Sequence, residues 1–195
     1  RVHQTAAKKY QKIKPEGVSL RWADFGEPGA TSPPHPHIHD GVVYASGHHD
    51  INDVTWWVLK HHGIAIFGPP PAALEIPVDW DALIGAMYEN VNSYWARFTT
   101  DPRRILWLYA DFGVEWTVLG TLRQFYSFRE SDITSKIGAG RYALQHLPRR
   151  WHRLIEEAIA IREGKAGSAY RSRLARAVDA YRFLRVVIAA CKKER

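Results

Sequence analysis

The chain has 195 residues, of which 46% are hydrophobic, and a formal net charge of +7. This length can bury roughly 70% of the unfolded surface, which is enough for one sizeable core. A single cysteine, Cys191, excludes an internal disulfide, no apolar run approaches the ~20 residues of a membrane span, and the first ten residues lack a signal-peptide pattern. We therefore expect a cytoplasmic protein.

The N-terminal region, residues 1–40, is rich in helix-breaking residues. The stretches Gly26–Gly29 and Ser32–His37 cannot form a regular helix, because proline lacks a backbone donor and restricts the residue before it. We expect a long surface loop here, with one strand near Val18–Trp22.

Helical patterns begin near Asp50. An amphipathic helix is expected to end at Gly63, followed by a short buried strand at Ile64–Phe67 that Gly68 and three prolines stop. Further helices are expected from a cap at Asp79 or Asp81 to Trp95, over about Arg104–Tyr126, over Lys136–His146 after a cap at Ser135, from Pro148 to Ile161, and over Ala169–Lys192, with a break at Gly164–Gly167.

These elements predict a mainly α fold: a helical bundle with a short irregular or β N-terminal segment. We expect two parts, an irregular segment over residues 1–48 and a helical domain over residues 49–195.

The positive charge is concentrated at the C-terminus. Residues 149–195 carry thirteen lysines and arginines against five acids, a net charge of +8, whereas the rest of the chain is close to neutral. A basic segment attracts phosphates of a nucleotide, a nucleic acid or a lipid surface. A solvated helix face has the same composition, so the charge alone does not choose between these.

Histidines are frequent near the start of the helical region: His35, His37, His39, His48 and His49 lie near Asp40 and Asp50, and His61 and His62 follow. Neutral imidazole is a good ligand for Zn or Ni. Because no cysteine and no HExxH spacing accompany them, we interpret them as exposed loop histidines and assign no metal ligand.

Two short patterns partly resemble catalytic motifs. The segment Ser46–Val54 fails the nucleotidyltransferase pattern of two Mg²⁺-binding acids with one residue between them, since Asp50 and Asp53 have two residues between them. We interpret both as helix-start residues. The pair Arg141 and His146 fits the loose pattern of HEPN ribonucleases, although Tyr142 replaces the usual polar residue. A HEPN-like ribonuclease is therefore kept as an alternative.

Several passages of the chain together resemble a known family. They are Asp50–Val54 through Gly63–Pro69, Val118–Tyr126, Ile133–Lys136, Leu147–Trp151, Glu157–Ala158 and Gly164–Lys165, and the stretch Val118–Lys165 aligns without gaps. From about Asp24 to Ala190 the sequence resembles the C-terminal domain of the streptomycin/spectinomycin adenylyltransferases and their relatives, in the nucleotidyltransferase superfamily.

The resemblance implies a helical domain that follows an α/β nucleotidyltransferase domain, with ATP and a small-molecule acceptor in the cleft between them and antibiotic resistance as the associated activity. Mg²⁺ would be held by that first domain, whose catalytic glutamate extrapolates to His3. Since the chain begins with Arg1, it looks processed, trimmed or incomplete. We assign no catalytic residue, expect the chain alone to be inactive, and expect a missing or separate nucleotidyltransferase domain as a partner.

The resemblance also assigns binding residues. Lys165 matches a lysine that faces ATP phosphates, Tyr181 matches a tyrosine that contacts the nucleotide, and Lys136 matches the lysine before the acceptor-binding helix. An exposed loop lysine and a core tyrosine remain the alternative interpretations of Lys165 and Tyr181.

Departures from the family concern the acceptor. Streptomycin-modifying members carry two aspartates where this chain has Ile137 and Arg141, and a tryptophan where Pro28 follows Phe25-Gly26-Glu27. Arg141 would repel a polycation. Streptomycin is therefore not an expected acceptor, and neither a membrane nor a nucleic acid is an expected partner. A stand-alone module that binds a separate nucleotidyltransferase remains a second alternative.

Overall fold

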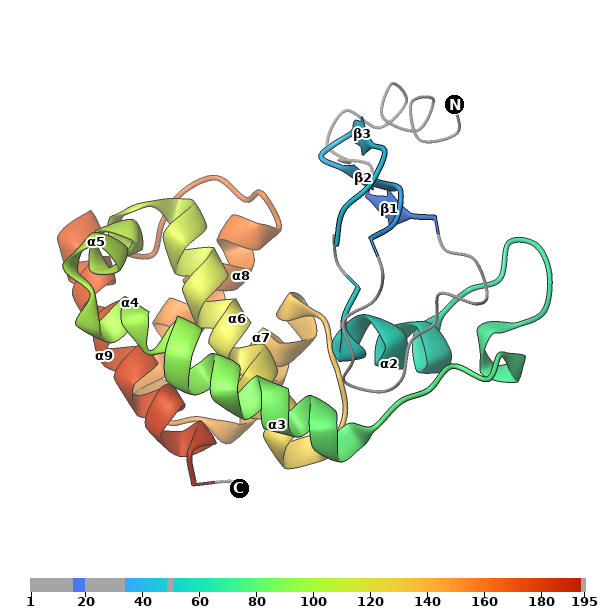
Figure 1. Ribbon diagram of the computed structural model, residues 1–195. Coiled ribbons are helices and arrows are strands. Elements are labelled where there is room, and N and C mark those ends of the chain that lie inside the picture. The colour runs from blue at the N-terminus through green and yellow to red at the C-terminus, as the bar shows by residue number, and fades with distance from the viewer. Residues whose placement is uncertain (1–15, 20–33, 49–50, 194–195) are drawn as a thin grey trace. The chain divides into compact units, whose positions relative to one another are not determined.

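The structure, a computed structural model, describes residues 16–19, 34–48 and 51–193 (Figure 1). These residues are mainly helical with one small sheet, which confirms the predicted fold class. The chain divides into two compact units, Arg1–Leu83 and Ile84–Arg195. The division expected between residues 48 and 49 stays a prediction.

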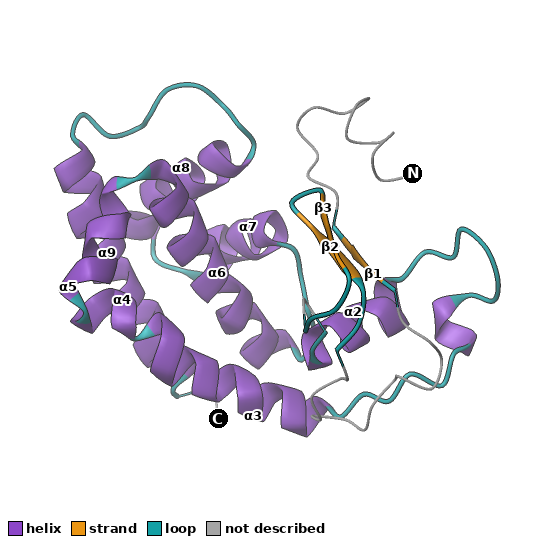
Figure 2. Cartoon of the chain, turned by 45° about the horizontal axis from the view of Figure 1, so that its top comes forward, coloured by secondary structure: helices purple, strands orange, loops and turns teal. Residues whose placement is uncertain are grey.

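A small antiparallel sheet lies in the first unit, in the order β1 (Gly17–Val18), β2 (His37–His39), β3 (Val42–Tyr44) (Figure 2). Asp40 and Gly41 join β2 to β3, both with positive φ, at 50° and 83°. This is the backbone of a two-residue type I′ turn, for which Asp-Gly is a preferred pair. The surface loop expected over residues 1–40 thus contributes two strands, and β1 lies at the start of the strand predicted at Val18–Trp22, whose last residues are outside the described ones.

The first described helix, α2 (Asp53–His62), confirms the helix predicted to end at Gly63. The Asn52 side chain caps it by accepting a hydrogen bond from the Thr55 amide at 3.1 Å. Asp53 lies in its first turn, as predicted, and Asp50 is outside the described residues.

The buried strand predicted at Ile64–Phe67 is wrong. This run has no strand hydrogen bonds, and the Ile66 residue is 98% exposed. A four-residue apolar run becomes a strand only where another strand pairs with it, and the three described strands pair with one another.

The second unit is a helical bundle built on α6 (Asp111–Glu130), against which α7 (Lys136–His146), α8 (His152–Arg162) and α9 (Arg173–Cys191) all pack (Figure 2). Before it come α3 (Trp80–Asn90), a π-helical turn at Val91–Trp95, α4 (Arg97–Thr100), α5 (Pro102–Ile105) and a 3₁₀ turn at Leu106–Tyr109. Another 3₁₀ turn, Arg149–Trp151, leads into α8. The helices expected after Asp79, Ser135 and Pro148 are confirmed, and the Asp79 and Ser135 side chains cap α3 and α7.

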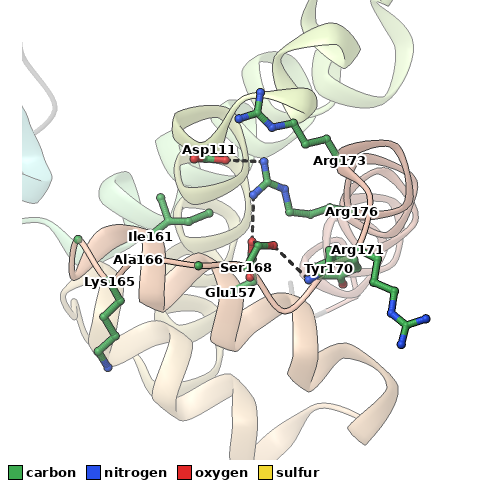
Figure 3. Close-up of a pocket in the computed structure, with 12 residues that line it drawn as sticks. Asp111, Glu157, Ile161, Lys165, Ala166, Ser168, Tyr170, Arg171, Arg173 and Arg176 are labelled. Carbon is green, nitrogen blue, oxygen red and sulfur yellow. Dashed lines mark hydrogen bonds and ion pairs between the residues drawn. The ribbon is translucent and has the colours of Figure 1, made fainter.

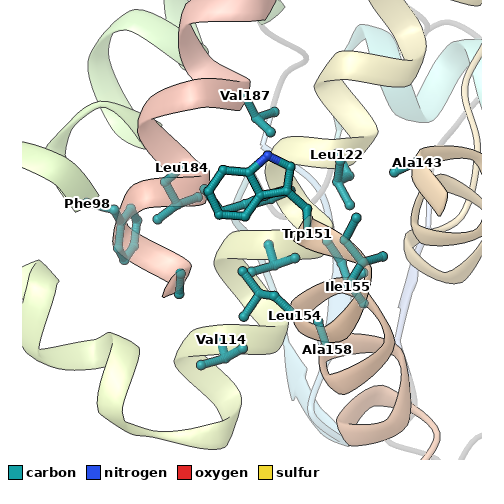
Figure 4. Close-up of a cluster of buried hydrophobic side chains, with 14 of the residues drawn as sticks. Phe98, Val114, Leu122, Ala143, Trp151, Leu154, Ile155, Ala158, Leu184 and Val187 are labelled. Atoms are coloured by element: carbon teal, nitrogen blue, oxygen red, sulfur yellow. The ribbon is translucent and has the colours of Figure 1, made fainter. Parts of the chain in front are cut away.

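The core of this bundle is continuous. Figure 4 shows Trp151, Leu154 and Ile155 packed among Phe98, Leu122, Leu184 and Val187 from neighbouring helices. Cys191, at the end of α9, belongs to the same core and is 1% exposed.

The helix predicted over about Arg104–Tyr126 is present as α6, but its predicted start is wrong, because a 3₁₀ turn separates α5 from α6. A Cβ at position 113 would lie 1.8 Å from the Trp107 carbonyl oxygen, so Gly113 permits this close approach. The last helix also begins later than predicted, at Arg173, where the Ser172 hydroxyl accepts hydrogen bonds from the Leu174 and Ala175 amides.

Candidate functional site

A pocket of about 550 Å³ lies in the second unit, where α8 ends, α9 begins and the start of α6 approaches both. Cationic side chains on its wall are Lys165, Arg171, Arg173 and Arg176. In Figure 3 the first three extend outward from the pocket, whereas Arg176 lies at its centre. The +8 segment of the sequence therefore contributes to a concave site as well as to solvated helix faces.

The turn that carries Lys165 is fixed by the way α8 ends. The Lys165 amide donates to the Ala160 carbonyl at 2.9 Å and the Gly164 amide donates to the Ile161 carbonyl at 3.0 Å. With Gly164 at φ 70°, this is a Schellman motif. The helix C-terminus thus sets the backbone position of Lys165, and Gly167, at φ 92°, turns the loop towards α9.

A buried ion-pair network forms the centre of the pocket. The Arg176 guanidinium, 3% exposed, donates to Glu157 Oε1 at 2.9 Å and to Asp111 Oδ1 at 2.6 Å (Figure 3). It also donates to the Tyr109 carbonyl at 3.2 Å. One arginine thereby ties α9 to α8 and to the start of α6.

Glu157 has further donors. The Ser168 hydroxyl donates to it at 2.6 Å and the Ala169 amide at 2.8 Å. Burial opposes its ionisation, but the hydrogen bonds from Ser168, Ala169 and Arg176 outweigh burial and lower the pKa of Glu157. Burial likewise acts against the charge of Arg176, and its two carboxylate partners raise its pKa. Both groups are charged in the folded protein and anchor the loop between α8 and α9.

Lys165, assigned to the nucleotide side, and Arg141, assigned to the acceptor side, both form ion pairs with Glu163. Lys165 Nζ lies 2.6 Å from Glu163 Oε2, and Arg141 Nη2 lies 3.7 Å from Glu163 Oε1. The hydrogen bond from Lys165 holds the pKa of Glu163 below its usual value. Both cationic side chains are largely exposed, at 67% and 70%. The structure thus brings these two residues together.

Lys136 is positioned differently, in a half-buried ion pair. Its Nζ donates to Glu115 Oε1 at 2.8 Å and lies 4.3 Å from the centre of the Trp116 ring. Burial lowers the pKa of Lys136 although Glu115 favours its charge, and Arg162 adds to the lowering. Ile137, the next residue, is half-buried on α7.

Tyr181 lies outside the pocket. Its hydroxyl donates to the Thr99 carbonyl at 3.3 Å, and its ring packs against the core. The tyrosine on the pocket wall is Tyr170, whose hydroxyl donates to Asp179 at 2.9 Å. Burial, followed by this hydrogen bond, raises the pKa of Tyr170 to about 12. The roles assigned to Lys165, Tyr181, Lys136, Ile137 and Arg141 stay predictions.

Several pocket residues were not predicted: Asp111, Arg171, Arg173 and Arg176, together with a role for Glu157. A signal for two of them existed in the sequence, because Glu157 and Arg176 interrupt the apolar faces of α8 and α9. Because buried charges in proteins are paired, each of these two residues predicts a partner of opposite charge.

The histidine region lies in the first unit. His39 Nδ1 is 3.1 Å from Glu16 Oε2, and ligand atoms of Glu16, His39 and Asp40 all lie within 4.8 Å of one another. All three are exposed, and such groups are common without an ion. His35 is buried, which corrects its interpretation as an exposed loop histidine, and His49 is outside the described residues.

The two residues of the ribonuclease pattern both lie on α7. Arg141 faces Glu163, whereas His146 stacks on the Tyr142 ring, with 3.9 Å between ring centres, and its Nδ1 is 2.9 Å from the Tyr142 carbonyl oxygen. The ribonuclease alternative stays a prediction.

The described second unit is thus a helical domain with an arginine-rich pocket. The profile of the family described as aminoglycoside adenylyltransferase, C-terminal domain, matches residues 75–185. The match covers more than half of the chain, and the chain belongs to this family, as the resemblance predicted. A search among curated proteins finds no match to the chain. None of the described helices has the length and apolar character that crossing a membrane requires.

Proposed function

We propose that the chain provides the helical half of an adenylyltransferase, and that the pocket between α8 and α9 binds the phosphates of ATP. The observation that carries the proposal is the set of Lys165, Arg171 and Arg173 around a pocket of about 550 Å³. This volume falls in the usual range of ligand sites, roughly 300–1,000 Å³. Long cationic side chains on a fixed loop can turn towards a phosphate and donate charge-assisted hydrogen bonds.

The donor set fits a triphosphate better than a metal ion. The carboxylates of Asp111 and Glu157, which also line the pocket, are engaged by Arg176. In this proposal Lys165, Arg171 and Arg173 hold the phosphates, and the carboxylates that bind Mg²⁺ belong to a nucleotidyltransferase domain on the same or a separate chain. ATP supplies the adenylyl group, which is transferred to a hydroxyl of the acceptor.

The acceptor side of the proposal rests on α7. Lys136 donates a hydrogen bond to Glu115, which fixes the start of α7. Ile137 and Arg141 occupy the positions at which a polycationic acceptor would require acidic side chains. We therefore propose a small-molecule acceptor other than streptomycin, modified in the cytoplasm. In this proposal Tyr181 does not contact the phosphates, because it lies outside the pocket and its hydroxyl donates to the Thr99 carbonyl.

Calorimetric titration tests the nucleotide site. ATP and inorganic tripolyphosphate are expected to compete for one site, and adenosine is expected to bind more weakly than ATP. The double substitution Arg171→Ala/Arg173→Ala should weaken both phosphate ligands, whereas Arg103→Ala/Arg129→Ala removes the same charge from exposed positions outside the pocket and should not. Equal losses of affinity in the two double variants would mean that net charge, and not the pocket, attracts the phosphates, and would overturn the proposal.

A further inference from the structure

A second hollow of the helical unit differs in character from the nucleotide pocket. It is an open groove of about 850 Å³ between the 3₁₀ turn before α8 and the outer face of α9. Its cations are Arg150, Arg182, Arg185 and Lys193, and we call it the basic groove. It shares no lining residue with the pocket between α8 and α9.

The charge of the basic groove is not neutralised by nearby acids. Among the described residues, none of its four cations has a carboxylate ion-pair partner. The acid in its lining, Asp179, is already engaged, since Arg153 and the Tyr170 hydroxyl both donate to its Oδ2 at 2.9 Å. Uncompensated charges in a concave surface attract a polyanion more strongly than the same charges spread over a flat face.

Three of the cations follow the C-terminal half of α9, with Lys193 just beyond its last residue. Arg182 and Lys193 are eleven residues apart, which is about 16 Å along a helix axis. A nucleic-acid duplex carries one negative charge per ~1.7 Å of its axis, so several phosphates lie within that length. Three of the four cations are arginines, whose planar guanidinium groups bind phosphate oxygens in pairs.

The floor of the basic groove indicates which form of nucleic acid it fits. Val186 and Ala189 are small, so a backbone can approach α9 closely. The aromatic residue in the lining, Trp151, lies with its ring in the core, 8% exposed, and presents no face for base stacking (Figure 4). Proteins that bind single strands use exposed aromatic platforms, whereas backbone contacts suffice for a duplex.

We propose that the basic groove binds the phosphate backbone of a nucleic-acid duplex without reading its sequence. This differs from the sequence-based expectation that a nucleic acid is not a partner, and it does not depend on the adenylyl-transfer proposal. The duplex would lie along the outer face of α9, with Arg182, Arg185 and Lys193 contacting successive phosphates and Arg150 flanking them.

The test is fluorescence anisotropy of the 195-residue chain with a labelled 20-base-pair duplex of mixed sequence, at 50 to 200 mM salt. Arg182→Ala/Arg185→Ala should lower affinity at least about tenfold and reduce the slope of log K against log salt by about 1 to 2, at ~0.9 per lost phosphate contact. The control Arg103→Ala/Arg129→Ala removes two exposed arginines of the same unit and should change little. Circular dichroism of each variant verifies folding.

Three outcomes would overturn the proposal. Absence of duplex binding by the parent chain removes it outright. Equal losses in the two double variants mean that net charge, not the groove, attracts the duplex. If poly-glutamate of matched charge displaces the duplex at equal concentration, the groove takes carboxylates as readily as phosphodiesters, and its occupant is an acidic protein segment.

Discussion

Lys165 Nζ donates to Glu163 Oε2 over 2.6 Å, across the turn that ends α8. Glu163 therefore competes with a bound phosphate for the Lys165 side chain. A phosphate that takes Lys165 must replace Glu163, and Glu163 keeps Arg141 as its second partner, at 3.7 Å.

Glu163→Gln should strengthen binding of ATP and of tripolyphosphate by about two- to fivefold, the range of a surface ion pair. The reason is that Lys165 loses its competing partner, while an amide of the same size keeps the turn intact. Calorimetry measures the change. The control Glu156→Gln removes the same charge from an exposed position on α8 and should leave the affinity unchanged. Weaker binding by Glu163→Gln would mean that the acid serves the site directly.

Lys165→Ala should weaken ATP binding by about 1–2 kcal/mol, the scale of one charge-assisted hydrogen bond. Its free energy of unfolding should change by less than about 0.5 kcal/mol, because the side chain is exposed and its amide makes the backbone hydrogen bond. Titration of ATP into both proteins, together with urea denaturation, gives the two numbers. Unchanged affinity would make Lys165 an ordinary solvated lysine.

Arg176→Met should lower the free energy of unfolding by about 3–5 kcal/mol, the usual cost of leaving a buried charge without its partner. Glu157 keeps Ser168 and Ala169 as donors but loses its cation. Urea denaturation measures the loss. The double substitution Arg176→Met/Glu157→Leu removes both charges, and it should recover part of the loss unless the destabilisation arises from packing alone.

The contribution of Glu157 to the free energy of unfolding should decrease at acid pH. Its pKa is lower in the folded protein than its ordinary value of 4.5, so its contribution is complete above that value and declines as the pH falls through the lower, folded pKa. The difference in unfolding free energy between the parent and Glu157→Gln should therefore shrink on acidification from pH 6 towards pH 3. Denaturation series at several pH values would show a constant difference if Glu157 were not ionised in the folded state.

Lys136 and Arg141 lie five residues apart on α7, and their substitution by alanine should destabilise the protein to different extents. Lys136→Ala leaves the buried Glu115 with Arg162 alone, at 3.5 Å, and should cost about 2–3 kcal/mol of unfolding free energy. Arg141→Ala removes an exposed side chain and should cost less than about 0.5 kcal/mol. Thermal or urea denaturation measures the stability of the two variants. Comparable losses of unfolding free energy would contradict the prediction that the buried ion pair of Lys136 matters more than the exposed one of Arg141.

Helices with clear caps were predictable from sequence. Ser135 and Asp79 cap the helices that periodicity predicted, because both the cap and the apolar face are local properties. The break between α5 and α6 was not predictable in this way, since it depends on Gly113 packing against the Trp107 carbonyl. The Asp40-Gly41 hairpin turn is a local property too, because Asp-Gly is a preferred pair for a two-residue turn with positive φ.

The candidate site was less predictable than the fold. A buried ion pair between Glu157 and Arg176 joins residues nineteen positions apart, and Asp111 joins from another helix. Each charge was visible as an exception on an apolar face, but its partner follows only from how the helices pack. The strand expected at Ile64–Phe67 failed for the related reason that hydrophobicity alone does not provide a pairing partner.

The position of Cys191 gives the molecule a built-in chemical reporter. Its thiol lies in the core at the C-terminal end of α9, so a thiol reagent can modify it only after that end of the helix detaches. Because the chain has no other cysteine, the rate of modification measures one event, the local opening of α9. A duplex held along the outer face of that helix would slow the reaction, whereas a nucleotide at its opposite end would leave the rate nearly unchanged.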